Sequence, residues 1–209
     1  STAVPERAAL MKRPMTACDA EAYVRGSYDK CLAKTDYLDS DNETARRMRE
    51  MFIMNMDYFM ATLLDRKDRM SMAHGLEVRV PFCDYRIVEY AYNIPWEMKS
   101  YTGREKGLVR HAMTGILPDD VLWRKKSPYP KTHNPNYMEL LSRRLREVLD
   151  RDDCRLVEIV SADKLREMLD TGGASFTKNW FGQLMTVPQI YAYMLQIEYW
   201  MREYAVEIK

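Results

Sequence analysis

The chain has 209 residues, of which 46% are hydrophobic and 30% charged, and its formal net charge is +1 at pH 7. This composition predicts one globular domain, or one and a fraction, and excludes a disordered chain. A net charge near zero argues against nucleic-acid binding by bulk electrostatics, and no apolar run approaches the ~20 residues that span a bilayer. The four cysteines, Cys18, Cys31, Cys83 and Cys154, lack zinc or redox spacing, which predicts reduced thiols in the cytoplasm.

Helical periodicity dominates the first part of the chain. A polar helix is expected to begin at the capping residue Asp19 and to run for about four turns. The longest periodic segment covers residues 40–75, with start signals at Ser40 to Asn42 and a stop at Gly75. Apolar side chains at helical spacing predict a core-facing stripe in this segment: Met48, Phe52, Met56, Phe59 and Leu63.

The next segment, "LEVRVPF" at 76–82, has the alternation of a short strand that ends at Pro81. Helices are then expected from Asp84 to before Pro95, over residues 104–113, and from Pro118. The pattern of the whole chain predicts a mostly α fold with at most one short strand.

Three prolines between Ser127 and Pro135 predict a shaped loop. Amphipathic helices are expected over 136–150 and 161–170, a turn over 171–179, and an aromatic-rich helix over 186–204. One face of the last helix is expected to be core or an interface: Tyr191, Met194, Ile197, Trp200 and Tyr204.

Charged side chains interrupt the apolar run "MAHGLEVRVPF" at 72–82. Alternation places Glu77 and Arg79 on one side, where they form either a solvated pair or the wall of a polar cavity. In a cavity, the carboxylate could align a nucleophile and the arginine could bind a phosphate or carboxylate bidentately. Spacing alone favours neither alternative. Just upstream, Asp65 and Arg69 are four residues apart on one helical face, the spacing of a surface pair. Their position among apolar residues weakens that interpretation: Leu63, Leu64, Met70 and Met72.

A second charged cluster, "WRKKSPYPK", carries Arg124, Lys125, Lys126 and Lys131. Such a run is usually a solvated turn. Here it lies where a helix is expected to end and a proline-stiffened loop to begin, a setting that can hold a lysine in fixed geometry. A positioned ammonium stabilises charge that develops on a transferring or leaving phosphate. No histidine or cysteine spacing predicts a metal site.

In their order along the chain, "DRKDRMSMAHGLEVRVPFCD", "GREKGLVRHAM" and "LPDDVLWRKKSPYPKT" resemble the C-terminal half of the synthetase domain of the asparagine synthetase family. The resemblance is strong from about Asp57 to Thr132. Matching positions in the first motif are Asp68, Arg69, Ser71, Met72, Ala73, Glu77, Arg79, Pro81, Phe82 and Asp84. Matching positions in the other two are Lys106, Leu108, Arg110, Leu117, Pro118, Arg124 and Lys126.

The resemblance implies a carbon–nitrogen ligase, an ATP-dependent and glutamine-dependent asparagine synthetase. ATP would adenylate the β-carboxylate of aspartate with Mg²⁺ assistance, and glutamine-derived ammonia would then displace AMP. It also implies that Lys126 is the catalytic lysine, with Lys125 the residue most easily confused with it. Glu77 becomes a catalytic candidate that orients substrate, and Arg79 and Arg69 become candidates for binding substrate or phosphate.

The family's nucleotide-binding loop, Ser-Gly-Gly-x-Asp-Ser, is not found in these 209 residues; "TGGAS" at 171–175 lacks the aspartate. Residues 1–209 are therefore expected to be the helical C-terminal part of an adenine nucleotide α-hydrolase-like (PP-loop) synthetase domain. The parallel nucleotide-binding sheet and the glutaminase domain would lie outside the chain. The chain alone is then expected to be inactive and to bind neither ATP nor Mg²⁺ tightly.

Two alternatives stay open at this point. One is a relative that forms an amide or β-lactam from another carboxylate, and the other is a helical interaction module without catalysis. The expected partners are aspartate, ATP and ammonia, with neither nucleic acid nor membrane. Helices that lack their sheet would expose apolar surface, which predicts self-association into a homo-oligomer.

Overall fold

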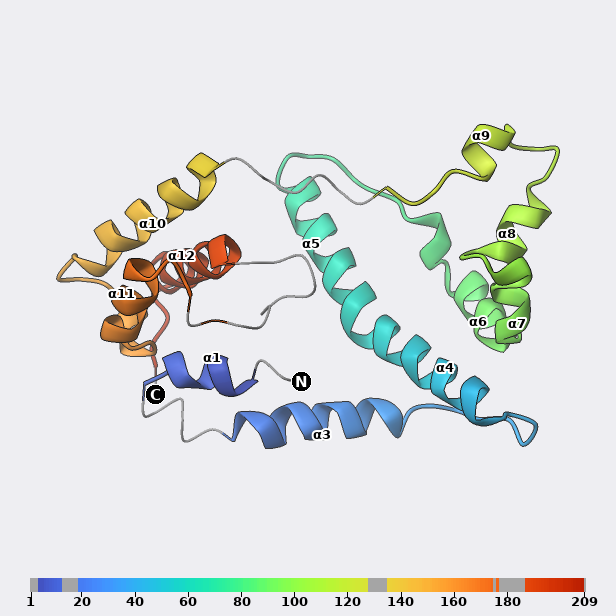
Figure 1. The fold of residues 1–209 in the computed structure, drawn as a ribbon, viewed down its shortest axis with the longest axis horizontal. Helices are drawn as coiled ribbons and strands as arrows, with labels where there is room; N and C mark the ends of the chain where they lie inside the picture. The colour runs from blue at the N-terminus through green and yellow to red at the C-terminus, as the bar shows by residue number, and fades with distance from the viewer. Residues whose placement is uncertain (1–3, 13–18, 128–134, 175, 177–186, 209) are drawn as a thin grey trace. The chain divides into compact units, whose positions relative to one another are not determined.

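The computed structural model describes residues 4–12, 19–127, 135–174, 176 and 187–208, and within them the chain is helical without a β-strand. The α-helices are α1 (Val4–Leu10), α3 (Ala20–Leu32), α4 (Glu43–Met54), α5 (Ala61–Met72), α6 (Tyr85–Asn93), α7 (Trp96–Lys99), α8 (Gly107–Ala112), α9 (Asp119–Leu122), α10 (Pro135–Leu149), α11 (Ala162–Asp170) and α12 (Val187–Glu203) (Figure 1). The π-helix η1 covers Asn55–Met60, and 3₁₀ turns cover Pro81–Cys83 (η2), Tyr101–Gly103 (η3) and Leu156–Glu158 (η4). The predicted mostly α class is confirmed. None of the described helices combines the length and apolarity that a membrane span requires.

The chain divides into two compact units. Unit 1 comprises Ser1–Val24 and Pro128–Lys209, and unit 2 comprises Arg25–Ser127. All residues of unit 2 are described, whereas the prolines predicted to shape the 127–135 loop fall largely outside the described residues. Every candidate site residue therefore lies in unit 2.

Unit 1 is built around an apolar core. Helices α10, α11 and α12 contribute most of it, and α10 packs against both of the others. Buried apolar residues of this core include Leu145, Val148, Leu156, Val160, Leu165, Met168, Tyr191, Met194 and Leu195. The segment after α1 joins the same unit, because the Lys12 amide donates to the Ile159 carbonyl and the Ser161 amide to the Leu10 carbonyl, each at 2.8 Å.

A carboxylate is fully buried in this core. Glu198 on α12 accepts a hydrogen bond from the Leu156 amide at 2.6 Å and pairs with Arg202 one turn later. Arg202 also donates to the Asp153 carboxylate at 2.9 Å, and these contacts hold the pKa of Asp153 well below its usual range, with Arg151 adding to the effect. The buried charge is therefore paired and hydrogen-bonded, as burial requires.

Unit 2 contains the long helical run predicted over residues 40–75. Asn42 caps α4 by accepting the Ala45 amide at 2.9 Å, and α4, η1 and α5 continue one another as a single rod before Gly75 turns the chain at φ +69° (Figure 1). The start and stop signals are thus confirmed. The π-helical turn at Asn55–Met60 was not predicted, because wider i→i+5 turns leave no simple signature in the apolar pattern.

The prediction that the stripe on this run is core was wrong for this chain. Neither α4, η1 nor α5 has a buried residue, and Phe59 is 62% exposed. One reason is geometric. A π-helix has more residues per turn than the 3.6 of an α-helix, so Met60 takes the half-buried position that the α-helical spacing assigned to Phe59. The second is that α6 covers the stripe only in part: the Phe52 ring contacts the Tyr92 ring at 5.3 Å between centroids, yet Phe52 stays half-buried.

Of the other local predictions, two helix caps are confirmed, one strand is wrong and one helix begins later than predicted. Asp19 caps α3 and Asp84 caps α6, by accepting the amides of Ala22 and Arg86 at 2.8 and 2.9 Å. The predicted strand at 76–80 is wrong, because those residues pair with no other segment of the described chain. The helix predicted over 104–113 begins only at Gly107, after Lys106 adopts a left-handed φ of 57°.

The last helix matches its predicted range, but only part of its predicted face is core. Tyr191 and Met194 are buried and Ile197 packs beside the core, whereas Trp200 and Tyr204 are exposed. The buried face turns instead through Glu198 and Met201.

Candidate active site

Glu77 and Arg79 form the ion pair that the sequence left undecided. The Arg79 Nε lies 2.8 Å from Glu77 Oε1, and the two side chains are 82% and 63% exposed. An exposed pair of this kind contributes at most about 1 kcal/mol to stability. Within this chain the pair is solvated, so its charges are available to a group that approaches from outside unit 2.

Val78 and Val80, which alternate with these charges, face the preceding helix. Val78 and Val80 line a shallow pocket of 360 Å³ together with Leu64, Asp65, Lys67 and Asp68 from α5. On the same helix, Arg69 Nε lies 2.7 Å from Asp65 Oδ1, which confirms the predicted i, i+4 pair. The structure thus places Arg69 on the helix adjoining the Glu77 segment, with its charge exposed.

The two candidate lysines follow α9 after Trp123 and Arg124. Lys125 and Lys126 are both exposed, and the backbone that leads to them is held from the side by Arg110 of α8. The Arg110 guanidinium donates to the Leu122 carbonyl and, at 3.3 Å, to the Arg124 carbonyl. The backbone just before the two lysines is therefore held in place, even though the lysine side chains are exposed to solvent.

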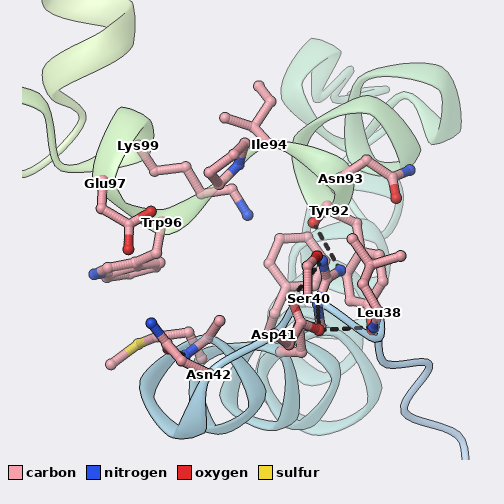
Figure 2. Close-up of a pocket in the computed structure, with 15 residues that line it drawn as sticks. Leu38, Ser40, Asp41, Asn42, Tyr92, Asn93, Ile94, Trp96, Glu97 and Lys99 are labelled. Carbon is pink, nitrogen blue, oxygen red and sulfur yellow. Dashed lines mark hydrogen bonds and ion pairs between the residues drawn. The ribbon is translucent and has the colours of Figure 1, made fainter.

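A smaller but more enclosed pocket of 220 Å³ lies elsewhere in unit 2, between the turn before α4 and the end of α6 with α7. Lys99 and Trp96 lie across this pocket from Asp41 and Leu38 (Figure 2). Arg49 binds Asp41 through Nε at 2.6 Å, with both side chains nearly buried, and lowers the pKa of that carboxyl. This pocket contains no candidate site residue, and its central charges neutralise each other.

Among the described residues, no group of three or more histidine, cysteine, aspartate or glutamate side chains is arranged to hold a metal ion. Three of the four cysteines, Cys31, Cys83 and Cys154, are free thiols, and Cys18 lies outside the described residues. Burial raises the pKa of the Cys31 thiol and of the Cys154 thiol, so neither has the lowered pKa of a reactive cysteine.

The model of the asparagine synthase family matches residues 3–202. The chain belongs to the asparagine synthase family. It is 50% identical over 186 residues to asparagine synthetase [glutamine-hydrolyzing] 3 of Bacillus subtilis (strain 168), which covers 89% of this chain and 30% of that protein. It is 46% identical over 68 residues to asparagine synthetase [glutamine-hydrolyzing] 1 of the same organism, covering 32% of this chain and 11% of that protein.

A third relative is the human asparagine synthetase [glutamine-hydrolyzing], which is 34% identical over 93 residues. That alignment covers 43% of this chain and 15% of the human protein. The chain thus spans less than a third of the length of each of these relatives. The predicted family is confirmed, and the homologues named here are ligases.

The contacts of Arg110 and of Glu198 were not foreseen in the sequence. Arg110 matched a family motif, but nothing in the sequence indicated that its partners are carbonyls beyond the next loop. The buried position of Glu198 could not be predicted from the sequence, because a glutamate one turn before Arg202 has the spacing of an ordinary surface ion pair.

Proposed function

We propose that this chain supplies the lysine-bearing helical part of an ATP-dependent, glutamine-dependent asparagine synthetase. In that reaction the aspartate β-carboxylate attacks the α-phosphorus of ATP and releases pyrophosphate. Ammonia from glutamine then attacks the β-aspartyl carbonyl, and AMP leaves. The observation that carries the proposal is the 50% identity over 89% of the chain to a glutamine-hydrolysing asparagine synthetase.

Lys126 is the residue proposed to stabilise the phosphate chemistry. It is exposed, it follows a backbone fixed by Arg110, and its ammonium can approach the α-phosphate and the departing pyrophosphate. Lys125 is the neighbouring candidate. Negative charge accumulates on the bridging oxygen as the phosphoanhydride breaks, and a lysine held there lowers the barrier without giving up its proton.

Glu77 and Arg79 are proposed to orient substrate. A carboxylate can bind the ammonium group of aspartate or of an incoming amine, and a guanidinium can bind a carboxylate bidentately. Their exposed ion pair supports this role because a partner can be exchanged at little cost in stability. Arg69, one helix back, is proposed to add positive charge near the phosphates.

Mg²⁺ would shield the phosphate oxygens of ATP in the whole enzyme. The described residues offer no acidic cluster for the ion, so its ligands are proposed to come from ATP and from segments outside them. ATP itself is proposed to bind mainly to a nucleotide-binding PP-loop sheet that the described residues do not form, with the exposed apolar side chains of unit 2 covered by that sheet.

The test uses the full-length enzyme and measures asparagine formation from aspartate, ATP and glutamine. Lys126→Ala should lower kcat by about 10²–10³-fold with little change in thermal unfolding. Lys30→Ala, which removes an exposed lysine on α3, is the control and should keep its activity. Near-normal turnover by Lys126→Ala would refute its role, and a collapse in Lys125→Ala instead would move that role by one residue.

A further inference from the structure

Three consecutive carbonyls at the end of α9 accept hydrogen bonds from arginines of another segment. Arg110 donates to the Leu122 and Arg124 carbonyls, and Arg104 donates to the Trp123 carbonyl between them at 3.4 Å. Leu122 is the last residue of the four-residue helix α9, and Trp123 and Arg124 follow it, so the helix supplies no partner for any of the three carbonyls. The arginines therefore replace water at the point where the chain leaves α9.

The guanidinium of Arg110 is itself held in place. Its side chain is only 13% exposed, and besides the α9 carbonyls it binds Glu105 twice, through Nε to the carbonyl at 3.0 Å and through Nη2 to the carboxylate at 3.1 Å. A planar guanidinium with partners on several edges has a single orientation. Lysine, with one nitrogen on a flexible stem, cannot reproduce this set of contacts.

Ring contacts stiffen the same platform. The His111 ring, next to Arg110 on α8, makes T-shaped contacts with the rings of Trp123 and Tyr101, at 5.5 and 4.8 Å between centroids. Arg104 lies over the Trp123 ring at 5.4 Å. Gly107 approaches the Tyr101 backbone so closely that a Cβ there would collide with it. α8 and the end of α9 thus form one packed assembly.

We propose that Arg110, assisted by Arg104, is a positioning residue that fixes the backbone from which Lys126 extends. This inference rests on the proposed function. Lys126 follows Arg124 by only two residues, a span of at most about 7 Å, so a shift of the Arg124 carbonyl is passed on to the Lys126 backbone. Because a displacement near 1 Å can cost two orders of magnitude in rate, the arginine acts on the reaction through the lysine and without touching substrate.

The test is a double-mutant cycle in the full-length enzyme, with aspartate-dependent ATP–pyrophosphate exchange as the readout. Arg110→Lys keeps the positive charge but loses the multiple contacts, and it should lower kcat about ten- to a hundredfold while the KM values for ATP and aspartate change less than about twofold. In an enzyme that already carries Lys126→Ala, the same Arg110→Lys change should have no further effect, because no ammonium is left to position.

Arg166→Lys is the matched control. Arg166 likewise binds a helix-terminal carbonyl and a carboxylate, those of Leu149 at 3.0 Å and Asp150 at 2.8 Å, but in unit 1 and with no candidate lysine beside them. It should leave kcat within about twofold, the change expected when only surface contacts are lost. If Arg110→Lys does not fold, Arg104→Lys supplies the cycle, with a smaller expected loss of kcat since a single carbonyl contact is removed.

The outcomes separate the two hypotheses. A loss of kcat that persists unchanged in the Lys126→Ala background would overturn the positioning role and leave the proposed function intact. An Arg110→Lys enzyme no slower than the Arg166→Lys control would also overturn it. Full exchange by Lys126→Ala alone would refute the assignment of Lys126, and the positioning role would fail with it.

Discussion

Unit 1 and unit 2 are both made of amphipathic helices, yet only unit 1 buries their apolar faces. In unit 1, apolar residues of α10, α11 and α12 are fully buried against one another. In unit 2, the buried apolar residues are only Cys31 and Leu122, and Phe59, Met70, Ile87 and Tyr90 are exposed. An apolar stripe therefore predicts which face of a helix packs against other residues. It does not show that those residues belong to the same unit.

The difference matches the proposed division of roles. Unit 1 has the core that an independently stable element needs, and unit 2 carries the candidate lysines and the Glu77–Arg79 pair. Surfaces as apolar as that of unit 2 usually mark an interface. We propose that this interface belongs to the nucleotide-binding part of the synthetase domain, with self-association of the isolated 209-residue chain as the consequence when that part is absent.

The largest expected contrast comes from truncating one apolar side chain in each unit. Leu165→Ala on α11 removes a side chain that is fully buried in unit 1 and should lower the free energy of unfolding of that unit by about 2–5 kcal/mol. Urea unfolding of the 209-residue chain, followed by circular dichroism, measures the shift.

The matched control is Phe59→Ala in unit 2. Because this ring is 62% exposed, its loss should change stability by less than about 0.5 kcal/mol. Equal losses for the two variants would mean that Phe59 is covered in solution, which would contradict the contrast between the units.

A smaller effect should appear on acidification, because a polar contact and not a core holds the start of α4. Arg49 lowers the pKa of Asp41 in the folded state, so the pair stabilises unit 2 fully above the unfolded-state value of about 3.9. That contribution is lost as pH falls through the folded-state pKa.

The amide of Leu38, which donates to Asp41 Oδ2 at 2.8 Å, reports this titration. Its NMR shift should follow a midpoint below pH 3.9, and Asp41→Asn should abolish the titration and the associated acid sensitivity of α4. A midpoint at or above the ordinary value would show that the Arg49 contact does not form in solution.

Local signals in the sequence predicted much of the fold. Asp19, Asn42, Asp84 and Gly75 set helix ends as expected, because capping depends on neighbouring residues alone. Tertiary context could not be read in the same way. The strand predicted at 76–80 needs a second strand to pair with, and no described segment provides one.

The candidate site was predictable to a similar extent. The i, i+4 pair of Asp65 and Arg69 follows from helical geometry alone. The Arg110 contacts with α9 depend on how an intervening loop folds back, so the sequence did not reveal them. The sequence left open whether Glu77 and Arg79 form a solvated pair or the wall of a polar cavity. Only the structure shows that the pair is exposed in this chain.

Amide hydrogen exchange of the 209-residue chain, read by mass spectrometry, tests the central contrast most directly. Amides in α10, α11 and α12 should open only with unfolding of unit 1, whereas those in α4, η1, α5 and α6 should exchange faster by orders of magnitude. Equal protection of the two sets would contradict the account, because it would show that unit 2 is as firmly packed on its own as unit 1.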